Sequence, residues 1–193
     1  SSFLDGRVTS SAAVYQIKQD NVAEADSGYF VPGTTTTASR AIKGATTRGI
    51  DLELNGTLAR GWNVAASYNF STSKDPNGQR INTTFPRQMA RLWTTYRMPG
   101  DWRRLTLGGG VDWSSGFYYT GEAWQIERTV TARQGAYAVA SLMARYEVND
   151  QLSLTLNVQN LFDRKYISSV SGWWYSGTYG APRNVQLTAR YKF

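Results

Sequence analysis

The chemically active side chains of this sequence are acids, amides, arginines and aromatics, because its 193 residues include no histidine and no cysteine. The absence of these two residue types excludes the usual nucleophile–base pairs and most transition-metal sites. Asp51 and Glu53 are two residues apart, which places them on one face of a strand. We expect them to pair with neighbouring arginines rather than to act as general acid and base. The sequence therefore predicts no enzyme.

Aromatic residues gather in two polar segments, where they could hold a large ligand. Aromatic faces offer apolar area with few rotamers to freeze, and arginine adds directional charge. In the alternative interpretation, some of these residues belong to an aromatic belt or pack one loop on another. The candidate ligand-binding residues are Tyr118, Tyr119 and Trp124 in one segment and Trp173, Trp174 and Tyr175 in the other.

The net charge of +7 favours an anionic partner, such as nucleic acid, lipopolysaccharide or an acidic small molecule. The basic residues are spread along the chain, however, so a diffusely charged, solvated surface is equally compatible with them. The chain opens without Met and without a signal-peptide pattern. We expect either a mature product or a piece of a longer chain.

Eight segments that alternate with period two would position these residues. In the last segment, Val185 to Phe193, apolar and polar side chains alternate. Its nine residues match the length of about 9–11 residues that a tilted strand needs to cross a bilayer. In the first segment, Ala13, Tyr15 and Ile17 are expected on the apolar face. The predicted strands are about 8–19, 50–58, 62–71, 87–98, 105–114, 138–148, 152–159 and 185–193.

The connections between these strands alternate in length, which is typical of an outer-membrane β-barrel with tight turns at one end and long loops at the other. Aromatic residues fall near both ends of the apolar faces, as in two membrane girdles. The short connections are 5–7, 59–61, 99–104 and 149–150, and the long ones, predicted as loops, are 20–45, 73–84, 117–135 and 163–182. The girdle residues are Trp62, Tyr146, Tyr191 and Phe193 at the short turns, and Tyr68, Phe70, Trp113 and Phe162 at the long loops.

Alternation alone does not say which face points outward. In a soluble β-sandwich, such as a carbohydrate-binding module, the apolar faces would pack inward. The strand lengths, the girdles and the terminal Phe193 favour an all-β, antiparallel transmembrane barrel. Charged residues such as Asp51, Glu53, Arg91 and Arg145 would then face a watery lumen or a plug rather than lipid.

The last forty residues contain two recognisable motifs. The block Leu154–Tyr166 contains Asn-Leu-Phe-Asp-x-x-Tyr, and Tyr179–Asn184 reads Tyr-Gly-Ala-Pro-Arg-Asn. Followed by an alternating strand that ends on Phe193, these motifs resemble the C-terminus of TonB-dependent ferric siderophore receptors. The segments 49–54, 85–87 and 92–97 fit the same family, so the resemblance spans nearly the whole chain. Within the family, the sequence is most similar to the ferric-coprogen, ferric-rhodotorulic acid and ferripyoverdine receptors.

This resemblance implies a 22-stranded barrel that encloses an N-terminal plug domain preceded by a TonB box. The present chain offers about eight strands, so residues 1–193 are expected to be the C-terminal part of the barrel, with the plug domain absent from this chain. A closed eight-stranded barrel, whose lumen is filled by side chains, is the alternative.

The resemblance also implies TonB-dependent uptake of a ferric siderophore, of hydroxamate type, across the Gram-negative outer membrane. Iron would arrive already chelated, so no cofactor is expected. The implied partners are the siderophore, the TonB–ExbB–ExbD complex, the plug domain, outer-membrane lipid or lipopolysaccharide, and the barrel-assembly machinery, with no nucleic acid. A passive porin-like or small structural outer-membrane barrel is the alternative function.

Two features near the C-terminus have structural explanations. We expect Asn160 and Asp163 to form local hydrogen bonds, and Phe162 and Tyr166 to anchor the strand at the outer membrane interface. The terminal strand, ending on Phe193, would be the signal that the barrel-assembly machinery reads, since an unpaired edge strand can template pairing.

Overall fold

The computed structural model describes residues 2–123, 127–170 and 177–193, and their main feature is one large antiparallel sheet. Each long strand pairs with the next long strand along the chain, so the eight predicted strands are confirmed. The long strands, in sheet order, are β2 (Val8–Lys18), β5 (Thr46–Ala59), β6 (Trp62–Lys74), β8 (Gln88–Arg97), β9 (Leu105–Ser114), β12 (Tyr137–Glu147), β13 (Leu152–Gln159) and β16 (Asn184–Tyr191).

Two short strands and one helical turn complete this sheet. β1 (Ser2–Phe3) pairs with β2, and β7 (Arg80–Ile81) pairs with the end of β6. The short connection between β8 and β9 contains a 3₁₀ turn, η1 (Gly100–Trp102). Within the described ranges, no helix has the length and apolar composition needed to cross a membrane.

Three of the four long connections are hairpins, so the prediction that they are loops is wrong. Their sequences contain β-branched and aromatic residues, which favour extended pairing even in a polar context. The hairpins are β3 (Val22–Phe30) with β4 (Thr37–Ile42), β10 (Phe117–Ala123) with β11 (Arg128–Gln134), and β14 (Ile167–Val170) with β15 (Gly177–Tyr179).

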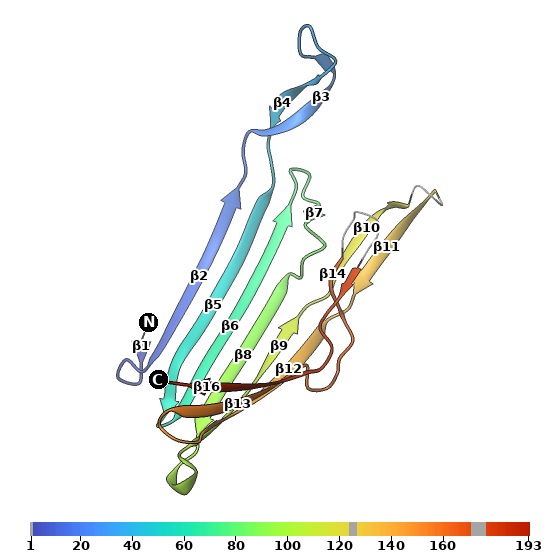
Figure 1. The fold of residues 1–193 in the computed structure, drawn as a ribbon. Helices are drawn as coiled ribbons and strands as arrows, with labels where there is room; N and C mark the ends of the chain where they lie inside the picture. Colours follow the sequence, from blue (N-terminus) through green and yellow to red (C-terminus); the bar gives the residue numbers. More distant parts are fainter. Residues whose placement is uncertain (1, 124–126, 171–176) are drawn as a thin grey trace.

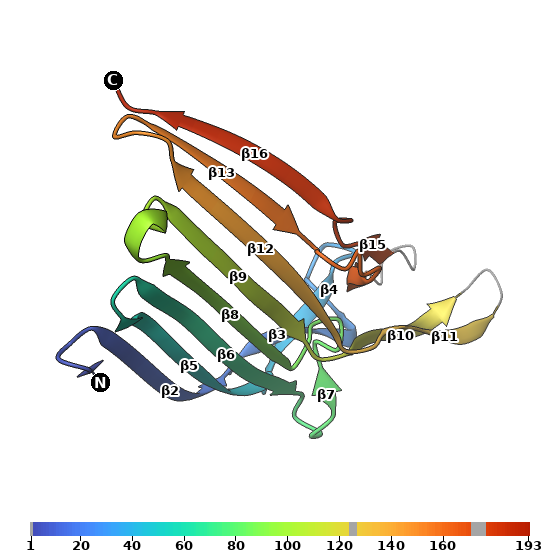
Figure 2. The ribbon, with the colours of Figure 1, turned by 90° about the horizontal axis from the view of Figure 1, so that it is seen from below.

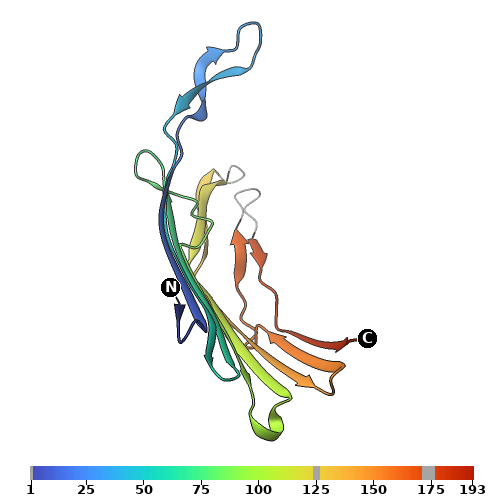
Figure 3. The ribbon, with the colours of Figure 1, turned by 90° about the vertical axis from the view of Figure 1, so that its left-hand side faces the viewer.

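The sheet is an open, curved trough with all three hairpins at the same end (Figure 1). The short turns lie at the opposite end, as the alternation of connection lengths predicts. Viewed from below and from the side, the strands follow an arc from β2 to β16 that does not close (Figures 2 and 3). In the described part of the chain, β16 pairs only with β13, so its other edge is unpaired.

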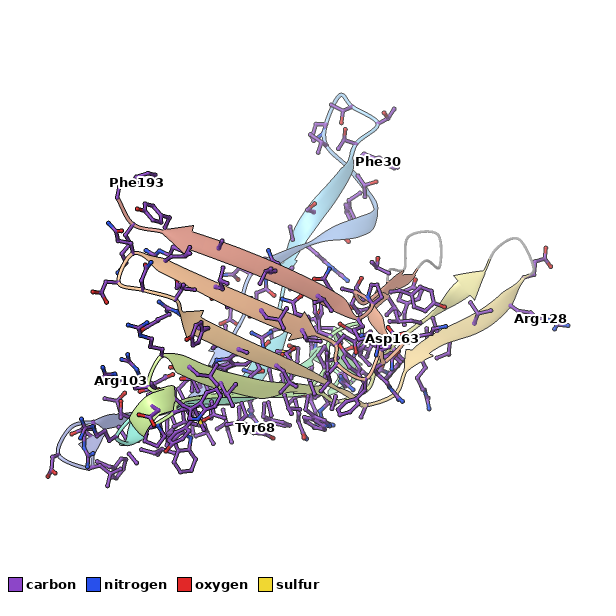
Figure 4. The ribbon with its side chains drawn as sticks, turned by 60° about the horizontal axis from the view of Figure 1, so that its bottom comes forward. Phe30, Tyr68, Arg103, Arg128, Asp163 and Phe193 are labelled. Carbon is purple, nitrogen blue, oxygen red and sulfur yellow. The ribbon has the colours of Figure 1, made fainter. Side chains whose placement is uncertain are left out.

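The apolar face of the sheet is exposed rather than packed. Leu52, Leu156 and Leu187 are 42%, 41% and 69% exposed, and Tyr68 lies on the convex side in Figure 4. Among the described apolar residues, only Val8, Phe117 and Val170 are buried. The apolar sides therefore do not meet in a dry interior, which excludes the sandwich interpretation and agrees with a lipid-facing surface.

The first long strand presents the opposite face from the one predicted. Its register places Val14 opposite Ile50 and Tyr15 opposite Gly49. Because directly opposite residues point to the same side of a sheet, Val14 lies on the outer face, and Ala13, Tyr15 and Ile17 lie on the inner face. A Cβ on Gly49 would overlap the Tyr15 ring, so this tyrosine lies across the glycine of the next strand. Register, not composition, decided the face.

Candidate functional site

Of the six predicted ligand-binding residues, the structure describes Tyr118 and Tyr119, both in β10. The remaining four, Trp124, Trp173, Trp174 and Tyr175, lie outside the described residues. Tyr118 and Tyr119 are half-buried and, as consecutive strand residues, point to opposite sides of the β10–β11 hairpin. The ring of Tyr119 lies against Gly121, where a Cβ would be 2.5 Å from the tyrosine oxygen.

Two arginines from different connections lie close to the ring of Tyr118. The guanidinium carbon of Arg80 in β7 is 5.8 Å from the centre of the Tyr118 ring, and that of Arg133 in β11 is 6.0 Å from it. Both distances are within the range of cation–π attraction. We call Arg80, Tyr118 and Arg133 the Arg–Tyr cluster.

Backbone pairing holds the Arg–Tyr cluster in place. Arg133 is directly opposite Tyr118 in the hairpin, and the Tyr118 amide donates a hydrogen bond of 2.8 Å to the carbonyl of Thr83. The neighbouring Phe117 is only 2% exposed, so it anchors the start of β10. The cluster thus joins the β6–β8 connection to the β9–β12 connection at the base of the long loops.

The electrostatics of this region are strongly positive. Burial, followed by repulsion from Arg87, lowers the pKa of Arg80 from its ordinary value, whereas Tyr118 acts in the opposite direction. The guanidinium carbon of Arg87 lies 5.3 Å from the centre of the Phe70 ring. Over the described ranges, none of the ion pairs involves Arg80, Arg87 or Arg133. The Arg–Tyr cluster and Arg87 therefore offer charge and aromatic surface without a neutralising carboxylate, which suits an anionic ligand.

A polar hollow of about 300 Å³ adjoins Arg80. Its wall contains hydroxyl groups, and Thr47 Oγ1 lies 2.8 Å from Ser73 Oγ. Hydroxyl groups and a guanidinium can bind oxygen-rich ligand groups by hydrogen bonds. The lining residues are Thr47, Ser71, Thr72, Ser73, Arg80, Ile81, Asn82, Phe85 and Pro86.

The acidic residues on the inner face take part in hydrogen bonds and ion pairs, not in a catalytic arrangement. Asp51 accepts a hydrogen bond from the Asn69 side chain instead of pairing with an arginine. The inner-face ion pairs are Arg91 with Asp112 at 3.2 Å, Arg97 with Glu147 at 3.0 Å, and Arg145 with Glu147 at 3.8 Å. No group of three or more acidic side chains that could hold a metal ion occurs in the part of the chain that the structure describes.

The Asn-Leu-Phe-Asp block is a structural clamp, as predicted. Asn160 is 3% exposed, and its amide donates to the carbonyls of Arg164 at 2.9 Å and Ala181 at 3.0 Å. Its oxygen accepts from the Arg164 amide at 2.8 Å. Asp163 accepts from the Arg183 amide at 3.0 Å. These bonds tie the end of β13 to the segment that enters β16.

The two aromatics of this block behave differently. Phe162 is 77% exposed, as an interface anchor would be. Tyr166 instead stacks on Tyr137, with ring centres 4.3 Å apart, and lies across Gly180, where a Cβ would overlap the ring. The expectation that Tyr166 anchors the strand at the membrane interface is therefore wrong, because its ring packs on protein.

Comparison with known proteins gives one consistent result. Residues 2–161 match the family described as TonB dependent receptor-like, beta-barrel. The ferric-pyoverdine 358 receptor of Pseudomonas putida is 43% identical over 191 residues, which make up 99% of this chain and 23% of that receptor. The ferripyoverdine receptor of Pseudomonas aeruginosa is 36% identical over 199 residues, covering 99% of this chain and 24% of that receptor.

The solved structures agree. The crystal structure of the ferripyoverdine receptor of the outer membrane of Pseudomonas aeruginosa, bound to ferripyoverdine, superposes with a TM-score of 0.88 at 35% identity. That match covers 100% of this chain and 26% of the receptor chain. The chain thus spans about a quarter of the length of the proteins it matches, and these relatives are receptors, in agreement with the prediction that the chain is not an enzyme.

Proposed function

Because this chain belongs to the TonB-dependent receptor β-barrel family of the Gram-negative outer membrane, we propose that it forms part of the wall and extracellular loops of a ferric siderophore receptor. The observation that carries this proposal is the 43% identity to a ferric-pyoverdine receptor over 99% of the chain. Residues 1–193 would supply the C-terminal part of the barrel. The rest of the receptor would supply the remaining strands and the plug domain.

The ligand is held at the long-loop end in this proposal. A ferric siderophore is a large, partly anionic chelate, so it needs both apolar area and positive charge. Tyr118, flanked by Arg80 and Arg133, offers both. The other predicted contacts are Tyr119, Trp124, Trp173, Trp174 and Tyr175.

In this proposal, iron is part of the transported ligand and not a cofactor of the protein. It arrives inside the preformed ferric siderophore, so the protein needs no metal ligands or cofactor of its own. The names of the relatives favour a siderophore of the pyoverdine type. A hydroxamate siderophore, expected from the sequence, stays a prediction that direct competition between the two ligand types would test.

The transport step would depend on partners outside this chain. Energy from the inner membrane, passed through the TonB–ExbB–ExbD complex, would move the plug domain and admit the bound siderophore. The barrel-assembly machinery would insert the receptor, reading the unpaired edge of β16.

The test uses the full-length receptor in a strain that lacks its own pyoverdine receptors. Uptake of ⁵⁵Fe-loaded pyoverdine should occur, should exceed uptake of a ferric hydroxamate, and should disappear when TonB is deleted. TonB-independent uptake of both chelates would establish the passive porin-like alternative instead.

Binding by the Arg–Tyr cluster has its own test. Replacing Arg80 by Gln, or Tyr118 by Ala, should raise the Kd for the ferric siderophore about tenfold, since a cation–π or charged contact contributes about 1–2 kcal/mol. Arg7→Gln, in a turn at the opposite end of the sheet, is the matched control and should leave the Kd unchanged. An unchanged Kd in the first two variants would remove the cluster from the binding site.

A further inference from the structure

A groove of about 590 Å³ crosses the outer, apolar face near the short turns. Most of its lining is apolar or aromatic. The groove residues are Trp62, Thr94, Tyr96, Leu107, Gly108, Gly109 and Leu142.

The groove exists because one outward position lacks a side chain. Gly109 of β9 is directly opposite Thr94 of β8 and Leu142 of β12, so a small residue and a glycine sit side by side among large ones. A Cβ on Gly109 would be 3.2 Å from Leu142 Cδ2 and would begin to fill the space. The aromatic rings of Trp62 and Tyr96, which are cross-strand partners, form the end nearest the turns.

The indole of Trp62 and the hydroxyl of Thr94, which line the groove, are already hydrogen-bonded within the protein. The Trp62 indole donates to Thr94 Oγ1 at 2.8 Å, and the Thr94 hydroxyl donates to the Asn63 carbonyl at 2.9 Å. Hydrocarbon can therefore cover these two side chains without leaving their donors unpaired. The groove thus suits an alkyl chain.

A second hollow, of about 720 Å³, continues from the groove around the short-turn end, and Tyr96 lines both. Three arginines border it. Arg97 is occupied, because it donates to Glu147 at 3.0 Å and to the Arg103 carbonyl at 2.7 Å. Arg60 and Arg103 are exposed and form none of the ion pairs found among the described residues.

We call Arg60 and Arg103 the cationic rim. This rim lies at the level expected for lipid headgroups. Arg103 projects at the short-turn end of the sheet in Figure 4, and Trp102 beside it is 65% exposed. Tryptophan and tyrosine concentrate at membrane–water interfaces, and basic residues there attract anionic headgroups. Groove and rim therefore present an apolar slot next to two arginines that form no ion pair among the described residues.

We propose that this surface binds one anionic glycerophospholipid from the membrane leaflet on the short-turn side. An acyl chain lies in the groove over Gly109, and the phosphate is held between Arg60 and Arg103. A protein partner is disfavoured because the groove opens on the face that meets lipid. Lipopolysaccharide is disfavoured because the rim is at the end opposite the long extracellular loops. The inference depends on the membrane placement of the sheet and not on which siderophore the receptor takes.

The test is lipid retention by the full-length receptor, released from nanodiscs into native mass spectrometry. The nanodiscs contain equal amounts of phosphatidylglycerol and phosphatidylcholine with the same acyl chains. Wild type should retain one phosphatidylglycerol in preference to phosphatidylcholine. Each of Arg60→Gln and Arg103→Gln should reduce that preference about fivefold, as expected for one basic residue at a membrane surface.

The groove has a separate variant. Gly109→Leu should fill it and reduce the retention of both lipids, whereas Ala138→Leu adds the same side chain to the outer face near Trp113 and should retain lipid normally. Arg7→Gln, in another short turn, is the control for charge. Folding is verified by the difference in gel mobility between unheated and heated receptor. If Gly109→Leu does not assemble, the lipid preference of Arg60→Gln and Arg103→Gln tests the proposal alone.

Three results would overturn the proposal. The first is equal retention of the two lipids by wild type. The second is a loss of preference in Arg7→Gln as large as in Arg60→Gln. The third is displacement of the retained phosphatidylglycerol by added lipopolysaccharide in wild type but not in Arg60→Gln, which would assign the rim to that glycolipid.

Discussion

The outer and inner faces of the same sheet carry different kinds of side chains. The outer face carries exposed leucines and aromatics, such as Leu156 and Tyr146, which are 41% and 45% exposed. The inner face carries ion pairs, such as Arg91 with Asp112. Adjacent residues of one strand therefore face different environments, lipid on the outer side and water on the inner side, because successive side chains point to opposite sides. The comparison shows that this sheet depends on lipid outside and water inside, and not on a buried core.

Glycine also differs between the two faces. On the inner face, Trp93 lies over Gly110, where a Cβ would come within 2.5 Å of the ring and would overlap the Leu92 carbonyl. On the outer face, Gly109 leaves an open groove. An aromatic ring laid across a glycine of the next strand strengthens the pairing of the two strands. The inner glycine is thus filled by a neighbour, whereas the outer one is left for something outside the protein.

The largest contrast should come from one charge placed on either face of β13. Leu156→Lys puts an ammonium group into lipid and should destabilise the folded receptor by about 2–4 kcal/mol. Asn157→Lys puts the same group on the inner face, opposite Met143 and Gln186. That variant should change stability by about 0.5 kcal/mol at most. The measurement is the urea midpoint of full-length receptor folded into vesicles. Equal midpoints for the two variants would contradict the assignment of the faces.

A smaller contrast is expected between the two adjacent glycines of β9. Gly110→Ala forces its methyl group against a backbone carbonyl and the Trp93 ring. This overpacking should cost about 1–3 kcal/mol. The methyl group of Gly109→Ala meets the flexible end of Leu142 instead. Because that end can move, this variant should cost about 0.5 kcal/mol at most.

The same urea titration compares the two glycine variants. A larger loss of stability in Gly109→Ala than in Gly110→Ala would mean that the groove has less free space than the structure shows.

The smallest effect should come from the inner-face ion pair. The side chains of Arg91 and Asp112 are 72% and 62% exposed, so water screens their attraction. Arg91→Gln, Asp112→Asn and the double variant should each lose no more than about 1 kcal/mol, with little coupling between them. A double-mutant cycle on the urea midpoint measures the coupling. Coupling above that value would indicate that another part of the receptor buries this pair.

The fold was largely predictable, and the failures have specific causes. Period two and the alternating connection lengths located all eight long strands. The hairpins in three long connections were missed because their polar segments carry no regular apolar alternation. The inner orientation of Tyr15 was missed because its strand has mixed residues on both sides, and only pairing with β5 selects one face.

The candidate site was predictable only in its residue types. Tyr118 was found as an aromatic in a polar segment, and Asn160 through its recognisable block. Arg80 was missed because it lies in another connection, and Arg133 because it meets Tyr118 only through the pairing of a hairpin that was predicted as a loop. The placement of one aromatic ring beside two arginines exists only in three dimensions.

The sequence by itself determined that these strands have one apolar and one polar side, because a strand's period of two is a local property of the backbone. Only the tertiary structure decided how neighbouring strands align, and register then selected the face of Tyr15, the pairing of Arg133 with Tyr118 and the groove over Gly109. The reason is that register is set by the turns and by many weak contacts between neighbouring strands, and no single strand contains that information.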